Sequence, residues 1–245
     1  MTYTPDVIIL TSADSGVRPM PPKYIVVHTS EPGPYARGKN PGTVASLLRF
    51  LANVDNQASY HAVVGREGDV GQSNTDEYAP WAAGYTANKD GLHICAMGWA
   101  AQPRDEWLTY GKQLEGIAKV IAAWSKSYGI PLTRIVGADL KAGKKGVTGH
   151  FDTAQAWRET DHTDPGVGFP FDDVISRAKK LLGTQPEAPV ADPNKVKSLV
   201  DGKEYSRDQF IQFNDLHNWR VDKMLTAICK RDGLPYTTEA LKQVR

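Results

Sequence analysis

The sequence is poor in cysteine, which limits the metal and disulfide sites that it can contain. Its 245 residues include two cysteines, Cys95 and Cys229, and no CxxC pair. Two cysteines are too few for a disulfide framework, and a zinc site built from cysteine pairs is excluded. Any metal site must therefore draw its ligands from histidine and carboxylate side chains.

The sequence also lacks a strong net charge and a long apolar run. The net charge is +1, so no electrostatic footprint suggests binding to nucleic acid. No apolar stretch approaches the ~18 residues of a membrane span, and we expect no membrane insertion. Residues 1–16 contain no basic segment and only a four-residue apolar run, so we expect no signal peptide.

A change in composition near Gly183 predicts the domain organisation. We expect a main domain over residues 1–183, a linker with three prolines over 184–195, and a helical segment over 196–245. Ser206 and Gln209 fit a capping box. An apolar stripe at helical spacing follows: Phe210, Phe213, His217, Val221, Met224 and Ile228. One helix cannot close a core alone, so this stripe is expected to face the main domain, another copy of the chain or an outside partner.

Within residues 1–183 the hydrophobic pattern alternates between strand and helix signals. The expected strands are 23–28, 91–98 and, more weakly, 134–137; a hairpin spans 59–72; the expected helices are 44–51, 107–129 and 171–182. Thr43 is the expected N-cap of the first helix, and Gly129 ends the second. This order predicts an α/β fold with a central mixed β-sheet flanked by helices.

The stretch GVTGHFDTAQAWRETDHTDPG, residues 146–166, gathers two histidines and a carboxylate: His150, His162 and Asp164. Each of them alone fits an ordinary structural histidine or a turn. A catalytic zinc ion, however, takes three protein ligands, and two histidines with one carboxylate are a known set. A loop between His150 and Asp164 would bring both to one ion, with His28 arriving from the end of a neighbouring strand.

Five motifs in order give a specific resemblance over residues 20–182: YIVVHTSE, SYHAVV, PWAAG, GVTGH and HTDPG. Together they resemble the zinc-dependent N-acetylmuramoyl-L-alanine amidases, a family that includes T7-lysozyme-like enzymes and peptidoglycan recognition proteins. The pattern TGHFDT…DHTDPG is most similar to the amidase module of bacteriophage endolysins, especially those aimed at actinobacteria.

The resemblance implies one zinc ion held by His28, His150 and Asp164. It places Tyr60 beside the zinc, and it places His162 where many relatives carry a lysine. Tyr60 and protonated His162 are then expected to donate hydrogen bonds to the oxyanion of the reaction. Unlike lysine, histidine loses its charge near neutral pH, so the hypothesis implies a rate that falls as pH rises past the pKa of His162.

The sequence departs from the family at the expected general base. Some relatives carry a glutamate where this chain has Cys95, and Glu31 is the expected substitute. Trp81 and Gly84, in PWAAG, are expected to border the substrate. The two remaining histidines of this region, His61 and His93, are expected to fill packing roles.

The sequence therefore predicts a peptidoglycan hydrolase that cleaves the amide bond between N-acetylmuramic acid and L-alanine and lyses the bacterial host. The alternatives are a peptidoglycan-binding module without catalysis and a cytoplasmic amidase that recycles muropeptides. As an endolysin, the protein would be made in the host cytoplasm and reach the wall after a holin opens the membrane. This route is implied by the resemblance alone.

Overall fold

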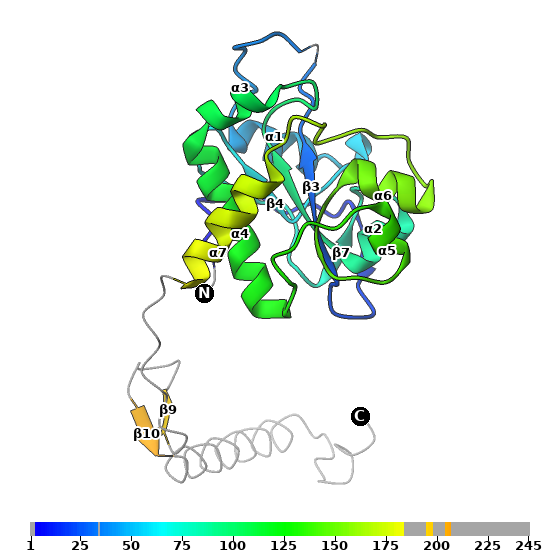
Figure 1. Ribbon diagram of the computed structural model, residues 1–245. Coiled ribbons are helices and arrows are strands. Elements are labelled where there is room, and N and C mark those ends of the chain that lie inside the picture. Colours follow the sequence, from blue (N-terminus) through cyan, green and yellow to red (C-terminus); the bar gives the residue numbers. More distant parts are fainter. Residues whose placement is uncertain (1–2, 34, 184–194, 198–203, 207–245) are drawn as a thin grey trace, which may run out of the picture. The chain divides into compact units, whose positions relative to one another are not determined.

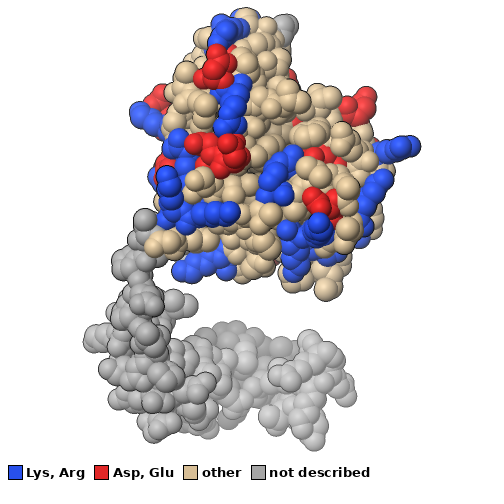
Figure 2. Space-filling view, in the orientation of Figure 1, with Lys and Arg blue, Asp and Glu red and all other residues tan. Residues whose placement is uncertain are grey.

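The computed structural model describes residues 3–33, 35–183, 195–197 and 204–206. The chain divides into two compact units, Met1–Gln185 and Pro186–Arg245. Among the described residues, no helix combines the length and the apolarity needed to cross a membrane. The face of the first unit shown in Figure 2 carries both basic and acidic side chains.

A six-stranded mixed sheet forms the centre of the first unit (Figure 1). Its strands lie in the order β1 (Val7–Ile8), β5 (Val70–Gln72), β4 (Ala62–Val64), β7 (Gly91–Ala96), β3 (Tyr24–Thr29) and β8 (Gly146–Gly149). Strands β4, β7, β3 and β8 are parallel, and β5 runs antiparallel to β4. A second, two-stranded sheet pairs β2 (Asp14–Val17) with β6 (Tyr78–Pro80). The predicted α/β fold with a mixed sheet is confirmed.

Helices cover both faces of the sheet, so every residue of β3 and β7 is buried. On one face, α4 (Gly111–Tyr128) and α7 (Phe171–Gly183) lie side by side and pack against Ile25 and Val27 (Figure 1). On the other face, α1 (Val44–Ala52) packs against Val63 and Cys95. Helices α5 (Gly137–Lys141) and α6 (His150–Trp157) cover Tyr24 and Val26 there. Because side chains alternate along β3, His28 shares the face of Val26.

Several local predictions are confirmed. Thr43 is the N-cap of α1: its side chain accepts a hydrogen bond from the Ser46 N–H, and the Ser46 side chain accepts one from the Thr43 N–H. Strands β4 and β5 form the expected hairpin, and α4 ends at Gly129 in the left-handed conformation. These features depend on neighbouring residues alone, so the sequence pattern captures them.

Two predictions about helices are wrong. The single helix expected over 107–129 is broken at Tyr110, between α3 (Arg104–Thr109) and α4. Gly111 gives this point a low helix propensity, and the Arg66 guanidinium lies 3.5 Å from the centre of the Tyr110 ring. The loop expected after His150 begins instead with α6, whose Asp152 carboxylate accepts the Gly149 N–H at 3.0 Å.

The weak strand expected over 134–137 is reduced to one parallel bridge between Arg134 and Val147. The chain turns there into α5, whose Asp139 carboxylate accepts the Val136 N–H. The short α2 (Tyr85–Asp90) and the 3₁₀ turn Val54–Asn56 were also missed.

In the second unit, the described residues form an antiparallel pair, β9 (Lys195–Lys197) with β10 (Glu204–Ser206). The sequence pattern did not predict this pair. The predicted helical stripe from Phe210 to Ile228 lies outside the described residues.

Candidate metal centre

Three predicted ligands converge where two neighbouring strands end. His28 lies in β3, His150 begins α6 directly after β8, and Asp164 lies in the loop after α6. Because β3 and β8 are adjacent and parallel, their carboxyl ends meet at one edge of the sheet. The ligand atoms of the three residues lie within 4.8 Å of one another, and all three residues are buried.

The imidazoles present their Nδ1 atoms to the two carboxylate oxygens. His28 Nδ1 lies 3.2 Å from Asp164 Oδ2, and His150 Nδ1 lies 3.0 Å from Asp164 Oδ1. The Thr29 N–H donates to Asp164 Oδ2 at 3.2 Å, and the Asp164 carbonyl accepts the Phe151 N–H. The carboxylate is thus held between the end of β3 and the start of α6.

Two atoms of this cluster are left without hydrogen-bond partners. His28 Nδ1 and Asp164 Oδ1 are buried and make no hydrogen bond to any described residue. Burial of an unpaired polar atom is costly, and a cation bound between these atoms would satisfy both lone pairs. Two neutral imidazoles and one carboxylate are also a donor set that zinc accepts. The residues therefore fit a zinc ion.

The protonation states favour this fit. Burial lowers the pKa of His28 to about 4, so its imidazole is neutral at pH 7. Burial by itself raises the pKa of Asp164, but the interactions with His150, His162 and His28 outweigh it and hold that pKa well below its usual range. Asp164 is therefore a carboxylate beside a neutral imidazole, which is the state that binds a metal.

Residues outside the predicted site orient these ligands. His28 Nε2 lies 2.9 Å from His93 Nδ1, and His150 Nε2 lies 3.0 Å from Thr160 Oγ1. Histidine at position 93 is a residue type typical of metal sites, but only the pairing of β7 with β3 shows that it lies beside His28. Thr160 carried no sequence signal. Partners of this kind are what fix metal-bound imidazoles in proteins.

Tyr60 and His162 border the cluster, as the sequence suggested. The centre of the Tyr60 ring lies 5.0 Å from that of His28, and the His162 ring stacks on that of His150 at 4.5 Å. Burial raises the pKa of the Tyr60 phenol well above its usual range, and the neighbouring Cys95 and Asp164 raise it further. The side chain of His162 is 61% exposed, and its interaction with Asp164 raises its pKa.

Glu31 is exposed and held in place just after β3. Its Oε1 accepts hydrogen bonds from the Thr29 hydroxyl and the Ala100 N–H, both at 2.6 Å. Glu31 lines a cavity of about 420 Å³, and the other lining residues include Leu47 and Phe50 of α1. Cys95, by contrast, is fully buried, and burial raises the pKa of its thiol well above its usual range. Glu31 is thus the more accessible carrier of a proton.

Trp81 and Gly84 make no described contact with the three predicted ligands. Trp81 is half-buried, and its indole N–H donates to Ser15 Oγ at 3.1 Å. Gly84 has a φ of +84°, and a Cβ there would lie 2.8 Å from a carboxylate oxygen of Glu159. That carboxylate accepts the Thr86 N–H and hydroxyl and so ties the loop after α6 to α2. The absence of a side chain at Gly84 thus leaves room for Glu159, which lies in the loop that carries Thr160.

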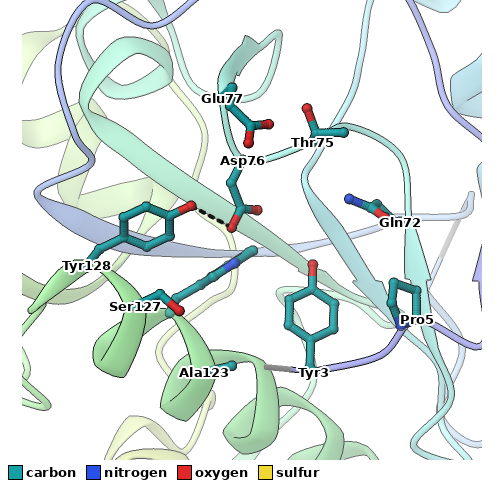
Figure 3. A pocket seen from close by; sticks show the side chains of 10 residues that line it. Tyr3, Pro5, Gln72, Thr75, Asp76, Glu77, Ala123, Ser127 and Tyr128 are labelled. Atoms are coloured by element: carbon teal, nitrogen blue, oxygen red, sulfur yellow. Dashed lines mark hydrogen bonds between the residues drawn. The ribbon is translucent and has the colours of Figure 1, made fainter. Parts of the chain in front are cut away.

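A separate cavity of about 340 Å³ lies against α4 (Figure 3). Its lining includes Tyr3, Asp76 and Tyr128, and the Tyr128 hydroxyl donates to Asp76 Oδ2 at 3.0 Å. Burial raises the pKa of Asp76, although the hydrogen bond from the Tyr128 hydroxyl opposes that rise. None of the predicted site residues lines this cavity.

The sequence profile of the N-acetylmuramoyl-L-alanine amidases (Amidase_2) matches residues 18–167. This segment contains His28, Tyr60, His150, His162 and Asp164. No curated protein matches the chain significantly.

Among solved structures, the hydrolase AmiA of Staphylococcus aureus, in complex with its ligand, superposes with a TM-score of 0.56 at 17% sequence identity. The alignment covers 75% of this chain and 87% of AmiA. The Ph2119 endolysin from the Thermus scotoductus MAT2119 bacteriophage Ph2119 superposes with a TM-score of 0.47 at 18% identity, over 70% of this chain and 98% of that one. At this identity, the likeness to AmiA shows a shared fold.

Proposed function

The chain belongs to the N-acetylmuramoyl-L-alanine amidase family, and from that membership we propose how its residues cleave peptidoglycan. The substrate bond is the amide between N-acetylmuramic acid and L-alanine. His28, His150 and Asp164 would hold one zinc ion. The observation that carries this proposal is the buried cluster of these three side chains, in which His28 Nδ1 and Asp164 Oδ1 lack hydrogen-bond partners.

When bound, zinc lowers the pKa of a coordinated water to about 7 and polarises a carbonyl group. His28 and His150 would each supply an Nδ1 lone pair. Asp164 would supply the negative charge, which its neighbours keep ionised. Because all three residues are buried, the chain presents them in a fixed arrangement.

Tyr60 and His162 would stabilise the oxyanion that forms at the attacked carbonyl. The raised pKa of Tyr60 keeps its hydroxyl protonated, so this group can donate a hydrogen bond. His162 is exposed beside His150, where its ring N–H groups can meet a substrate. Donors directed at a developing negative charge supply a large part of catalysis in acyl transfer.

Glu31 would accept the proton of the attacking water, as a substitute for the glutamate that Cys95 replaces. It is exposed, and the adjoining cavity gives a substrate access to it. The half-buried Trp81 remains a predicted substrate contact. Gly84, which leaves room for Glu159, also remains a predicted substrate contact.

The motif pattern TGHFDT…DHTDPG also supports a biological proposal. We assign the protein the role of a bacteriophage endolysin that lyses its host, reaching the cell wall from the cytoplasm through a holin-dependent opening. The proposed partner is thus the intact peptidoglycan of the wall.

The proposal is tested by digesting purified peptidoglycan with the full chain, with and without a chelator. Mass spectrometry should find new L-alanine amino termini, no new reducing sugars, and no products after chelation. Restoration of cleavage by added Zn²⁺ would identify the metal. Binding to sacculi without cleavage would favour a recognition module, and cleavage of soluble muropeptides but not sacculi would favour a recycling enzyme.

A further inference from the structure

His93 lies in β7, beside the first proposed zinc ligand, and contacts it directly. Its Nδ1 is 2.9 Å from His28 Nε2, and its Nε2 is 3.1 Å from the Ala87 carbonyl oxygen. His93 is fully buried and His28 is 1% exposed, so no bulk water competes for these contacts. The ring centres of the two imidazoles are 5.2 Å apart.

The Ala87 carbonyl decides which nitrogen of His93 carries the proton. A carbonyl oxygen can only accept, so His93 Nε2 must donate to it. In a neutral imidazole, His93 Nδ1 is then an acceptor, and it can only receive the proton of His28 Nε2. Because His93 is fully buried, a charged imidazole is disfavoured there and the ring is neutral.

The same chain of hydrogen bonds determines the other nitrogen of His28. With its proton on Nε2, neutral His28 keeps a lone pair on Nδ1, the atom that lies 3.2 Å from Asp164 Oδ2. Without an acceptor at Nε2, the imidazole would gain by moving its proton to Nδ1 and donating to Asp164. That tautomer would be unable to bind a metal through Nδ1.

We propose that His93 is a positioning residue that fixes the tautomer of His28 and so readies Nδ1 for a metal ion. The inference rests on the proposed zinc site and goes beyond it, because it assigns a role to a residue outside the three ligands. His61 supports His93 from its other side: the His93 backbone N–H donates to His61 Nδ1 at 2.9 Å. The His61 ring also stacks on that of His93.

A matched pair of substitutions, His93→Asn and His93→Leu, separates positioning from packing. Both variants lose the imidazole and have similar size. Only asparagine keeps an acceptor oxygen close to the place of Nδ1. Zinc affinity of the full chain would be measured by competition with a fluorescent zinc chelator. His93→Leu is expected to bind zinc about 10–100-fold more weakly than the parent, and His93→Asn to recover most of that loss.

The tautomer itself is read from the imidazole nitrogen shifts of His28 by NMR on the zinc-free protein. The parent and His93→Asn are expected to show the proton on Nε2, and His93→Leu to show it on Nδ1. Equal zinc affinities for His93→Leu and His93→Asn would overturn the inference. So would a parent protein with the proton on His28 Nδ1, a result that needs no folded variant. A parent that binds no zinc would instead contradict the proposed zinc site.

Discussion

At the scale of single residues, the proposed centre separates groups that bind the metal from a group that binds the transition state. We propose the second role for Tyr60, because its ring packs beside His28 while the proposed ligand atoms come from other residues. Its phenol remains protonated at any ordinary pH, since burial raises its pKa. A permanent hydrogen-bond donor next to the metal suits an oxyanion better than it suits a cation.

We therefore expect Tyr60→Phe to lower kcat by about 10²–10³-fold with little change in KM, the usual effect of losing one oxyanion donor. Zinc affinity should stay at the parent value. Kinetics on a soluble muropeptide and chelator competition check the two expectations. Tyr128→Phe, in the separate cavity, is the matched control and should leave kcat unchanged. A large loss of zinc affinity in Tyr60→Phe would show that the tyrosine orients His28 instead.

At the scale of elements, two carboxylates, Asp152 and Asp76, join loops to helices. Asp152 is 1% exposed and has several partners: it accepts from the Gly149 N–H and the Thr148 hydroxyl and pairs with Arg134 at 2.6 Å. This carboxylate fixes the start of α6, and with it the position of His150. Asp76 joins the turn after β5 to α4 through Tyr128, and burial raises its pKa.

The raised pKa of Asp76 predicts a pH-dependent stability. The folded protein holds the Asp76 proton more tightly than the unfolded chain, so this contribution to stability is present below the unfolded pKa of ~3.9 and is lost as pH rises through the folded pKa. Asp76→Asn removes the charge and still accepts from the Tyr128 hydroxyl. It should raise Tm at pH 7 and give little change at pH 3.

Calorimetry at pH 3, 5 and 7 can resolve this effect, because 1 kcal/mol shifts Tm by about 2–4 °C in a domain of this size. Peptidoglycan cleavage should not change, since the cavity of Figure 3 contains none of the proposed catalytic residues. A lower Tm for Asp76→Asn at pH 7 would show that attraction between Asp76 and Arg18 outweighs the cost of burial.

At the scale of the whole molecule, the chain consists of a unit with its own core and a second unit that follows it. All proposed ligands and catalytic residues lie in Met1–Gln185. The domain proposal remains a catalytic domain over 1–183, a linker over 184–195 and a segment over 196–245 that targets the wall or mediates self-association. The β9–β10 pair lies at the start of this segment, and the helix predicted after it lies outside the described residues.

A chain truncated after Gln185 should cleave soluble muropeptides at the rate of the full chain, because the sheet and the centre are complete within it. On intact sacculi it should be slower, by about 10²-fold or more at low enzyme concentration, if the second unit adds a second binding contact. Equal rates on sacculi would remove the wall-targeting role. Sedimentation of the full and truncated chains would then test self-association.

Local sequence pattern by itself determines several elements of this protein. Four features follow from residues that are neighbours in sequence: the strand β3, the capped helix α1, the β4–β5 hairpin and the end of α4. The ligand types follow from composition, because a chain with two cysteines has histidine and carboxylate to offer. The break at Tyr110 escaped prediction because it is shaped by Arg66, a residue distant in sequence. The helix after His150 has a local signal, the Asp152 carboxylate that accepts the Gly149 N–H, which the prediction overlooked.

Only the tertiary structure decided which of these residues meet. The order β7-β3-β8 places His93 and Asp164 against the end of β3. His93 is 65 residues from its hydrogen-bond partner His28, and Asp164 is 135 residues from its partner Thr29. Strand order is a property of the packed sheet, and no local pattern encodes it. The sequence thus supplied the proposed ligands by kind and order, and the sheet supplied His93 as the partner of His28 Nε2.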